Sequence, residues 1–119
     1  MSELERRWRG AEEGHSLYLC CSAGEGADFS FGGWIFQAEG VKVGLADGVV
    51  VSKSGMVYFT DATYKYNYRS ALNDLLEGRP HGRLLSYDPS TKQTKVIARD
   101  LYFANGVELS PDQDFVIFC

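Results

Sequence analysis

The hydrophobic positions after residue 41 come in short runs separated by turn residues, and one such run occurs twice. Residues 46–52 (ADGVVVS) match residues 104–110 (ANGVELS), 58 positions further along the chain. Each copy is followed by a turn and then by a second apolar run, at residues 56–60 in the first copy and 115–118 in the second. A strand, a tight turn and a strand that recur at a long period are typical of radial β-sheet repeats.

Between the two copies the pattern predicts a second hairpin. Residues 82–87 and 95–98 are strand-like and flank a turn that contains Asp, Pro and Ser. Four strands per repeat is the blade of a β-propeller, which normally takes ~40–50 residues. An insertion at residues 64–80 explains the longer period here. We therefore predict an all-β fold that forms about two blades of a propeller.

The insertion is expected to hold one short helix near residues 69–77. Ser70 is a candidate N-cap, and Gly78 is suited to end the helix. The apolar positions have the i, i+3, i+4 spacing of one helical face: Leu72, Leu75 and Leu76. We interpret this helix as a lid or packing element without chemistry of its own.

Residues 1–37 lack the regular pattern and are predicted to be an atypical, weakly structured segment that precedes a domain at 38–119. The first 15 residues are rich in charge, and the apolar run at 17–21 is shorter than the ~7–15 residues of a signal-peptide core. No signal peptide is therefore predicted. Residues 29–36 suggest a strand that is broken by two glycines.

The last residues, 115–119, are apolar on both alternating faces, which is typical of a central strand that is covered on both sides. A chain that ends in such a strand leaves apolar surface and a hydrogen-bonding edge without partners. We expect a truncated propeller that self-associates through exposed strand edges.

The composition argues against a membrane-spanning, a nucleic-acid-binding and a zinc-binding protein. The chain has 119 residues, a formal net charge of -4 and 45% hydrophobic residues, as expected for a globular protein. No apolar run approaches the ~20 residues of a transmembrane helix, and no basic block suggests nucleic-acid binding. The cysteines and histidines are too scattered for a zinc site: Cys20, Cys21, Cys119, His15 and His81.

Three longer motifs carry a family resemblance. Residues 56–63, 75–89 and 103–112 read MVYFTDAT, LLEGRPHGRLLSYDP and FANGVELSPD. Together they closely resemble the conserved region of the strictosidine-synthase-like proteins of plants. The resemblance covers about residues 38–119 and implies a partial six-bladed β-propeller. Residues 1–37 do not resemble the family, which favours an aberrant or alternative start.

The resemblance implies two chemistries on a small-molecule substrate. The namesake enzyme condenses an amine with an aldehyde in alkaloid biosynthesis, with a glutamate as acid/base group that would lie beyond Cys119. Related propellers of the paraoxonase, gluconolactonase and adipocyte membrane-associated type hold calcium in a central channel and hydrolyse esters or lactones. We favour the hydrolase type, inactive in this truncated chain, over the condensing type and a non-catalytic binding fragment. The resemblance also implies the secretory pathway or the vacuole.

Asp47 and Asn105 occupy the same place in the two repeats. Repeat-equivalent positions on inner propeller strands converge on the axis, so both side chains are candidate ligands of one ion. Calcium takes ~6–8 oxygen ligands, and the resemblance assigns the remaining ones to other blades. The calcium enzymes of the resemblance have asparagine at both positions, and Asp47 departs from that pattern. The alternative is that Asp-Gly and Asn-Gly only form turns. No calcium is expected on this fragment alone.

Tyr66 in the insertion and His81 directly after it are two further candidate residues. Tyr66 lies where the resemblance implies a tyrosine of the substrate pocket, against the alternative of a packing role. His81 could shuttle a proton, but no base, nucleophile or orienting carboxylate is identifiable beside it in the sequence. We therefore predict that His81 lies in a turn at the start of a strand. Sequence motifs for a serine nucleophile, a phosphate loop or a dinucleotide site are missing.

Overall fold

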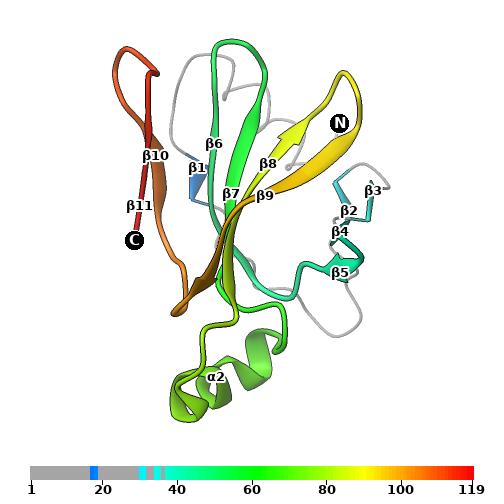
Figure 1. Ribbon diagram of the computed structural model, residues 1–119, viewed down its shortest axis with the longest axis vertical. Coiled ribbons are helices and arrows are strands. Elements are labelled where there is room, and N and C mark those ends of the chain that lie inside the picture. The colour runs from blue at the N-terminus through cyan, green and yellow to red at the C-terminus, as the bar shows by residue number, and fades with distance from the viewer. Residues whose placement is uncertain (1–16, 19–29, 32–33, 36) are drawn as a thin grey trace.

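The structure, a computed structural model, describes residues 17–18, 30–31, 34–35 and 37–119 (Figure 1). A 3-10 turn, η2 (Tyr68–Ser70), runs directly into the helix α2 (Ala71–Glu77). The strands are β1 (Leu17–Tyr18), β2 (Ser30–Phe31), β3 (Trp34–Ile35), β4 (Gln37–Ala38), β5 (Val41–Lys42), β6 (Ala46–Val51), β7 (Val57–Asp61), β8 (Gly82–Asp88), β9 (Gln93–Leu101), β10 (Val107–Leu109) and β11 (Val116–Phe118).

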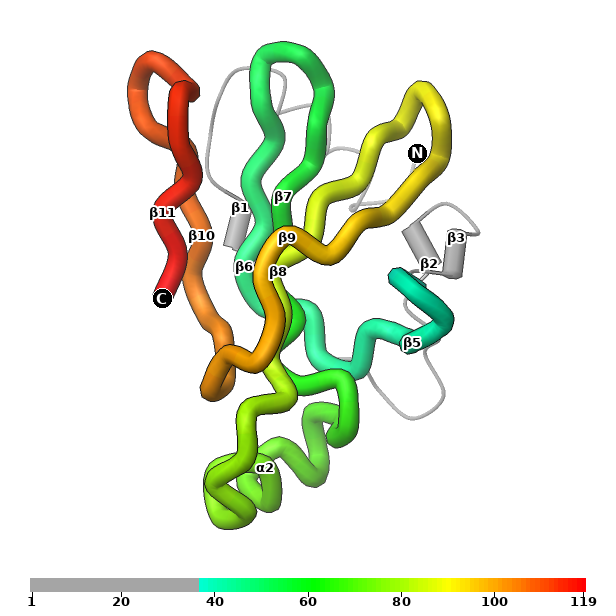
Figure 2. The backbone as a smooth tube through the Cα atoms, viewed as in Figure 1, coloured from blue at the N-terminus to red at the C-terminus, as the bar shows by residue number. Residues whose placement is uncertain are grey.

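The main sheet has the strand order β1-β6-β7-β8-β9, with antiparallel neighbours throughout. Each strand from β7 to β9 pairs with the one before it, so that β6–β9 form the four-stranded meander of a propeller blade. The hairpin β10–β11 stands beside β6 as a separate two-stranded sheet (Figure 2). The described chain therefore holds one complete blade and the first two strands of a second. The predicted all-β, partial propeller is confirmed.

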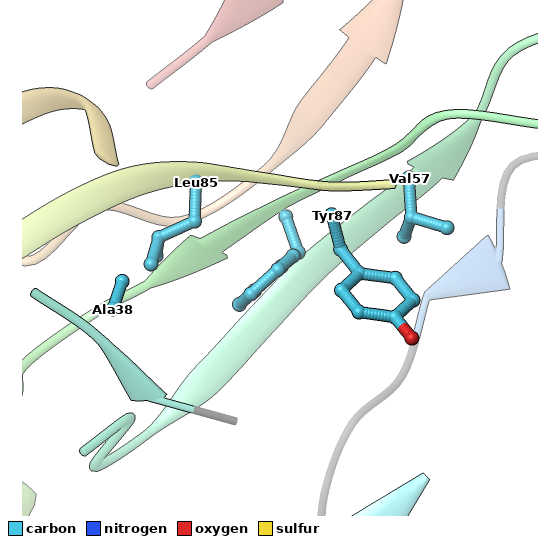
Figure 3. Packing of buried hydrophobic residues seen from close by; sticks show 5 residues of the cluster. Ala38, Val57, Leu85 and Tyr87 are labelled. Carbon is cyan, nitrogen blue, oxygen red and sulfur yellow. The ribbon is translucent and has the colours of Figure 1, made fainter. Parts of the chain in front are cut away.

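Side chains alternate between the two faces of the blade, and each face carries a buried apolar cluster. One face packs against β4 and has a core in which Leu85 is fully buried (Figure 3). The opposite face packs against the β10–β11 hairpin. The buried residues of the first face are Ala38, Val57, Phe59, Leu85 and Tyr87, and those of the second are Val50, Leu84 and Val107.

The predicted helix near 69–77 is present as η2 and α2, and Gly78 ends it in the left-handed conformation with φ 63°. Ser70 is the N-cap residue of α2, as predicted, but it does not cap the helix through its side chain. The Ser70 hydroxyl is bonded to Asn67. Asn67 caps the preceding 3-10 turn instead, with its Oδ1 accepting the Ser70 amide at 3.1 Å.

The next observations concern the two ends of the chain. Leu17 and Tyr18 pair with β6, and β2 pairs with β3; the rest of the weak pattern at 17–21 and 29–36 lies outside the described residues. The same holds for Cys20, Cys21 and His15. Phe115 and Ile117, at the C-terminal end, are exposed. Within the described residues, no helix is long and apolar enough to cross a bilayer.

Candidate functional site

Three glycines allow separate backbone segments to meet at one end of the blade, where β6 begins and β7 ends. A Cβ atom needs at least about 3.0 Å to the nearest heavy atom. At each of these three glycines an added Cβ would have a neighbour closer than that. The collisions would be with backbone, which cannot move aside as a side-chain tip can: at Gly44 with Thr63, at Gly48 with Asn105 and at Gly82 with Leu101.

The contact at Gly48 joins the two repeats. A Cβ there would come within 2.8 Å of both the Asn105 carbonyl oxygen and the Val107 amide nitrogen. The Thr60 hydroxyl lies in the same junction, where it accepts the Gly48 amide at 2.9 Å and donates to the Asn105 carbonyl oxygen. Thr60 is fully buried. The backbone of the first repeat therefore touches that of the second beside the two candidate ligands.

Asp47 is half-buried and Asn105 is exposed at this junction. Burial raises the pKa of the Asp47 carboxyl above its ordinary value of 3.8. Among the described residues, neither side chain has a hydrogen-bond or ion-pair partner. Asn105 is held through its backbone, whose amide donates to the Cys119 carbonyl oxygen at 2.6 Å. Both candidate side chains are therefore without a bonding partner in the part of the chain that the structure describes.

This donor set fits calcium as part of a coordination shell. Carboxylate and amide oxygens are the hard ligands that calcium takes, and an ionised carboxylate without a cation nearby gains most from one. In the described part of the chain, no group of three or more His, Cys, Asp or Glu side chains is placed to hold a metal ion. A calcium ion bound by Asp47 and Asn105 would need further oxygen ligands to complete its shell.

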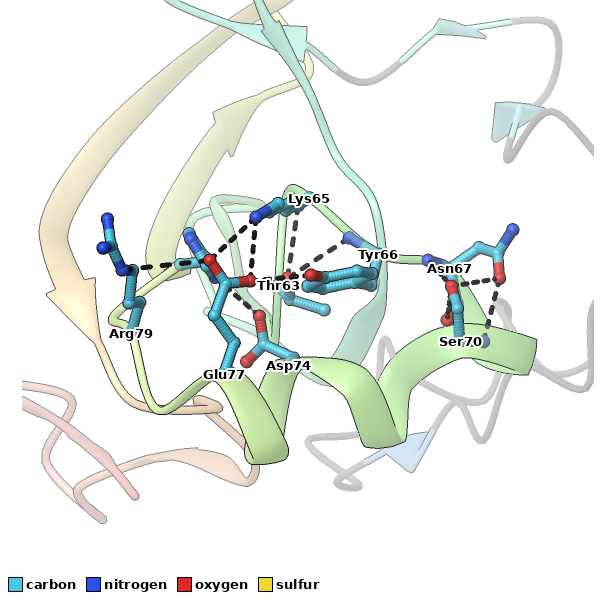
Figure 4. A network of polar contacts seen from close by, with 9 residues as sticks. Thr63, Lys65, Tyr66, Asn67, Ser70, Asp74, Glu77 and Arg79 are labelled. Carbon is cyan, nitrogen blue, oxygen red and sulfur yellow. Dashed lines mark hydrogen bonds and ion pairs between the residues drawn. The ribbon is translucent and has the colours of Figure 1, made fainter.

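Tyr66 belongs to a polar network on the insertion (Figure 4). Its hydroxyl donates to Glu77 Oε2 at 2.6 Å, and Lys65 Nζ donates to both carboxylate oxygens of Glu77 at 2.8 Å. The bond from Lys65, and then that from Tyr66, lowers the pKa of Glu77 to about 2. The Tyr66 hydroxyl is thus already used within the protein, which favours a packing role over direct substrate contact.

His81 does have an orienting carboxylate, contrary to the interpretation of the sequence. Its Nδ1 lies 2.7 Å from Asp74 Oδ1, and both side chains are buried. Two tyrosine rings pack against the imidazole in T-shaped arrangements, with centroids at 5.4 Å for Tyr64 and 6.3 Å for Tyr66. Asp74 precedes His81 by seven residues and lies on the other side of the helix end, so only the fold brings the pair together.

A second buried pair fixes the chain that leads into β6. Arg83 Nη2 donates to Asp61 Oδ2 at 2.7 Å and to the Lys42 carbonyl oxygen at 2.9 Å. Asp61 Oδ1 accepts the amides of Gly44 and Leu45. Burial raises the pKa of Asp61, and the Arg83 guanidinium and these amides oppose that shift. The pair holds residues 41–45 against the end of β7, and the bonded Leu45 amide lies two residues before Asp47 in the chain.

Comparison with known proteins agrees with this architecture. The family model described as strictosidine synthase matches residues 47–119 of the chain. The chain belongs to the strictosidine synthase family. Both repeats, the insertion and all three motifs that carry the resemblance lie within or overlap this match.

Relatives within and around the strictosidine synthase family share most of the described region. Protein STRICTOSIDINE SYNTHASE-LIKE 6 of Arabidopsis thaliana is 58% identical over 83 residues, which are 70% of this chain and 22% of the relative. STRICTOSIDINE SYNTHASE-LIKE 4 of the same plant is 51% identical over the same shares. The adipocyte plasma membrane-associated protein of Rattus norvegicus is 42% identical over 80 residues, or 66% of this chain and 21% of the relative. The chain spans about a fifth of the length of these relatives.

Proposed function

We propose that this chain contributes Asp47 and Asn105 as oxygen ligands to a calcium ion on the axis of a complete propeller, in an ester or lactone hydrolase. The observation that carries the proposal is the junction at Gly48, where the two repeats meet through backbone. The half-buried Asp47 carboxylate supports the proposal, since it has no ion-pair partner among the described residues. Burial disfavours its charged form, which a bound cation would stabilise.

Calcium would act there as a Lewis acid that polarises the carbonyl oxygen of an ester or lactone. The residues of this chain would hold two of its coordination positions. Asp47 would supply charge, and Asn105 would supply a neutral oxygen from a backbone fixed at both its amide and its carbonyl. Gly48 and Thr60 would fix the spacing of the two backbone segments that carry the ligands, since Gly48 lies against the Asn105 carbonyl oxygen and the Thr60 hydroxyl bonds to both segments.

The condensation of an amine with an aldehyde is the second chemistry that the resemblance implies. No specific observation in the described residues favours it, because Tyr66, the candidate substrate contact, has its hydroxyl bound to Glu77. Incubation with tryptamine and secologanin, followed by mass detection of the adduct, separates the two activities. The calcium proposal predicts that no adduct forms.

The test uses a chimaera in which the matched region of this chain replaces the corresponding 83 residues of STRICTOSIDINE SYNTHASE-LIKE 6, which supplies the other blades. Calcium should raise the melting temperature of the chimaera, and a chelator should reverse the rise. Asp47→Ala and Asn105→Ala should each remove most of the response. Asp114→Ala, at an exposed carboxylate on the β10–β11 turn, should leave the response intact. A melting temperature that ignores calcium and chelator would overturn the proposal.

A further inference from the structure

The helix α2 exposes its apolar residues and buries an acidic one, which is the reverse of an ordinary surface helix. A surface helix normally buries its apolar stripe and exposes its charges. In α2 the acidic side chain of Asp74 is only 2% exposed, whereas Leu72, Leu75 and Leu76 are 65%, 56% and 77% exposed. Tyr68, one turn before Leu72, is 57% exposed as well. The leucines that the sequence suggested as a packing face therefore point away from the protein.

Two polar anchors hold α2 in this orientation. Asp74 is bonded to the buried His81, and Glu77 is bonded to Lys65 and Tyr66. Rotating the leucines inward would break both anchors and expose a buried histidine–carboxylate pair (Figure 4). The outward apolar face is thus a property of the fold at this site.

The insertion that carries this face is more basic than the chain as a whole. The insertion at 64–80 contains three basic and two acidic residues in a chain whose net charge is -4. Both acidic residues already have partners: Asp74 contacts the buried His81, and Glu77 contacts Lys65 at 2.8 Å and Arg79 Nε at 3.9 Å. Arg69 and Arg79 are exposed and lie at the two ends of the leucine-bearing segment.

We propose that the segment Tyr68–Arg79 lies in the interface of an anionic lipid bilayer, with its leucines in the acyl boundary and its arginines among the headgroups. A short helix with one apolar face, an aromatic residue and flanking cations is suited to lie on a membrane surface. The placement of α2 agrees with this, because it projects beyond the end of the sheet (Figures 1 and 2). This surface is separate from Asp47 and Asn105 and does not depend on their proposed role.

The first test measures cosedimentation of the chain with vesicles of phosphatidylcholine and phosphatidylserine, and with vesicles of phosphatidylcholine alone. Leu72→Ser/Leu76→Ser should weaken binding to the anionic vesicles about tenfold or more, since two exposed apolar side chains are lost. Arg69→Gln/Arg79→Gln should weaken binding about fivefold or more and reduce its dependence on salt. Binding should be weaker on the neutral vesicles.

The matched control changes two equally exposed apolar residues elsewhere. Ile97 on β9 is 50% exposed and Ile117 on β11 is 57% exposed. Ile97→Ser/Ile117→Ser should leave vesicle binding within about twofold of the unchanged chain, because these residues lie on other elements. Equal losses of vesicle binding in the leucine and the isoleucine double variants would indicate nonspecific hydrophobic binding and would overturn the proposal.

A tryptophan fluorescence experiment distinguishes a true loss of lipid binding from a loss caused by unfolding of the variant. Leu76→Trp should show a blue shift of its fluorescence on anionic vesicles, and Ile97→Trp should not. Sedimentation without lipid gives the remaining outcome. Leucine-dependent dimers that do not bind vesicles would assign the face to a second copy of the chain and contradict the membrane proposal.

Discussion

The two copies of the repeat form the same hairpin in different surroundings. In the first copy the Ser52 amide donates to the Met56 carbonyl oxygen at 2.8 Å, and the Met56 amide donates to the Ser52 hydroxyl at 3.0 Å. In the second copy Ser110 and Phe115 exchange the equivalent bonds at 3.0 and 3.2 Å. The local sequence is therefore sufficient to define the turn, with or without cover from neighbouring strands.

The surroundings decide burial. Phe59 on β7 is 6% exposed because the first copy lies inside the main sheet, with neighbours on both faces. Its counterpart Phe118 on β11 is 37% exposed. Thr60 joins the two copies by hydrogen bonds, whereas the corresponding Cys119 is an exposed free thiol. The comparison shows which contacts belong to the hairpin itself and which belong to the assembled blade.

The largest expected effect is at the Asp61–Arg83 pair, which anchors the end of the first copy. Arg83→Met should lower the free energy of unfolding by about 3–5 kcal/mol, because it leaves the buried Asp61 carboxylate without its cation. Urea unfolding measures the change. Arg99→Met is the control, since Arg99 pairs with Glu39 on the surface and should contribute about 0–1 kcal/mol. Similar losses in the two variants would contradict this account of the first copy.

The next effect distinguishes the two equivalent glycines. Gly48→Ala should cost about 1–3 kcal/mol, since the new Cβ meets backbone atoms of the second copy at 2.8 Å. Gly106→Ala should be close to neutral, because its nearest new contact is Cys119 Sγ at 3.7 Å. Both are read by urea unfolding. If Gly106→Ala were the more damaging variant, the proposed junction between the copies would be wrong.

Removing the Thr60 hydroxyl tests the same junction without adding a steric clash. Thr60→Val keeps the shape but leaves the Gly48 amide and the Asn105 carbonyl without this partner, which should cost about 1–3 kcal/mol. Thr60→Ser keeps the hydroxyl and should recover most of the loss. Cys119→Val, at the equivalent and exposed position, should change unfolding little. Equal stability of the Val and Ser variants at Thr60 would argue against the hydrogen-bonded link.

The smallest expected effect concerns charge in the two turns. Ser110 donates to Asp112 at 2.6 Å and lowers the pKa of Asp112, whereas Ser52 in the first copy bonds to the neutral Ser54. A lowered carboxyl pKa stabilises the fold above its ordinary value of 3.8, and this stabilisation is lost as the pH falls through the lowered value. Asp112→Ser should therefore flatten the acid limb of an unfolding curve, and Ser54→Ala should leave its shape unchanged.

The sequence predicted the repeats, both hairpins and the position of the helix, because period and turn chemistry are local properties. It could not predict that Asp74 would orient His81 or that Arg83 would reach Asp61, 22 residues away, since these contacts depend on how elements pack. Periodicity placed Leu72, Leu75 and Leu76 on one helical face but could not say whether that face would meet the sheet. The equivalence of Asp47 and Asn105 was visible in the sequence, whereas the backbone junction beside them was not.

The most direct measurement is a double-mutant cycle on calcium-dependent stability in the chimaera. If Asp47 and Asn105 bind one ion, Asp47→Ala and Asn105→Ala should each remove most of the rise in melting temperature that calcium produces. The double variant should then lose little more than either single variant. Losses that simply add, or a calcium response that neither substitution changes, would contradict the convergence of the two repeats on one ion.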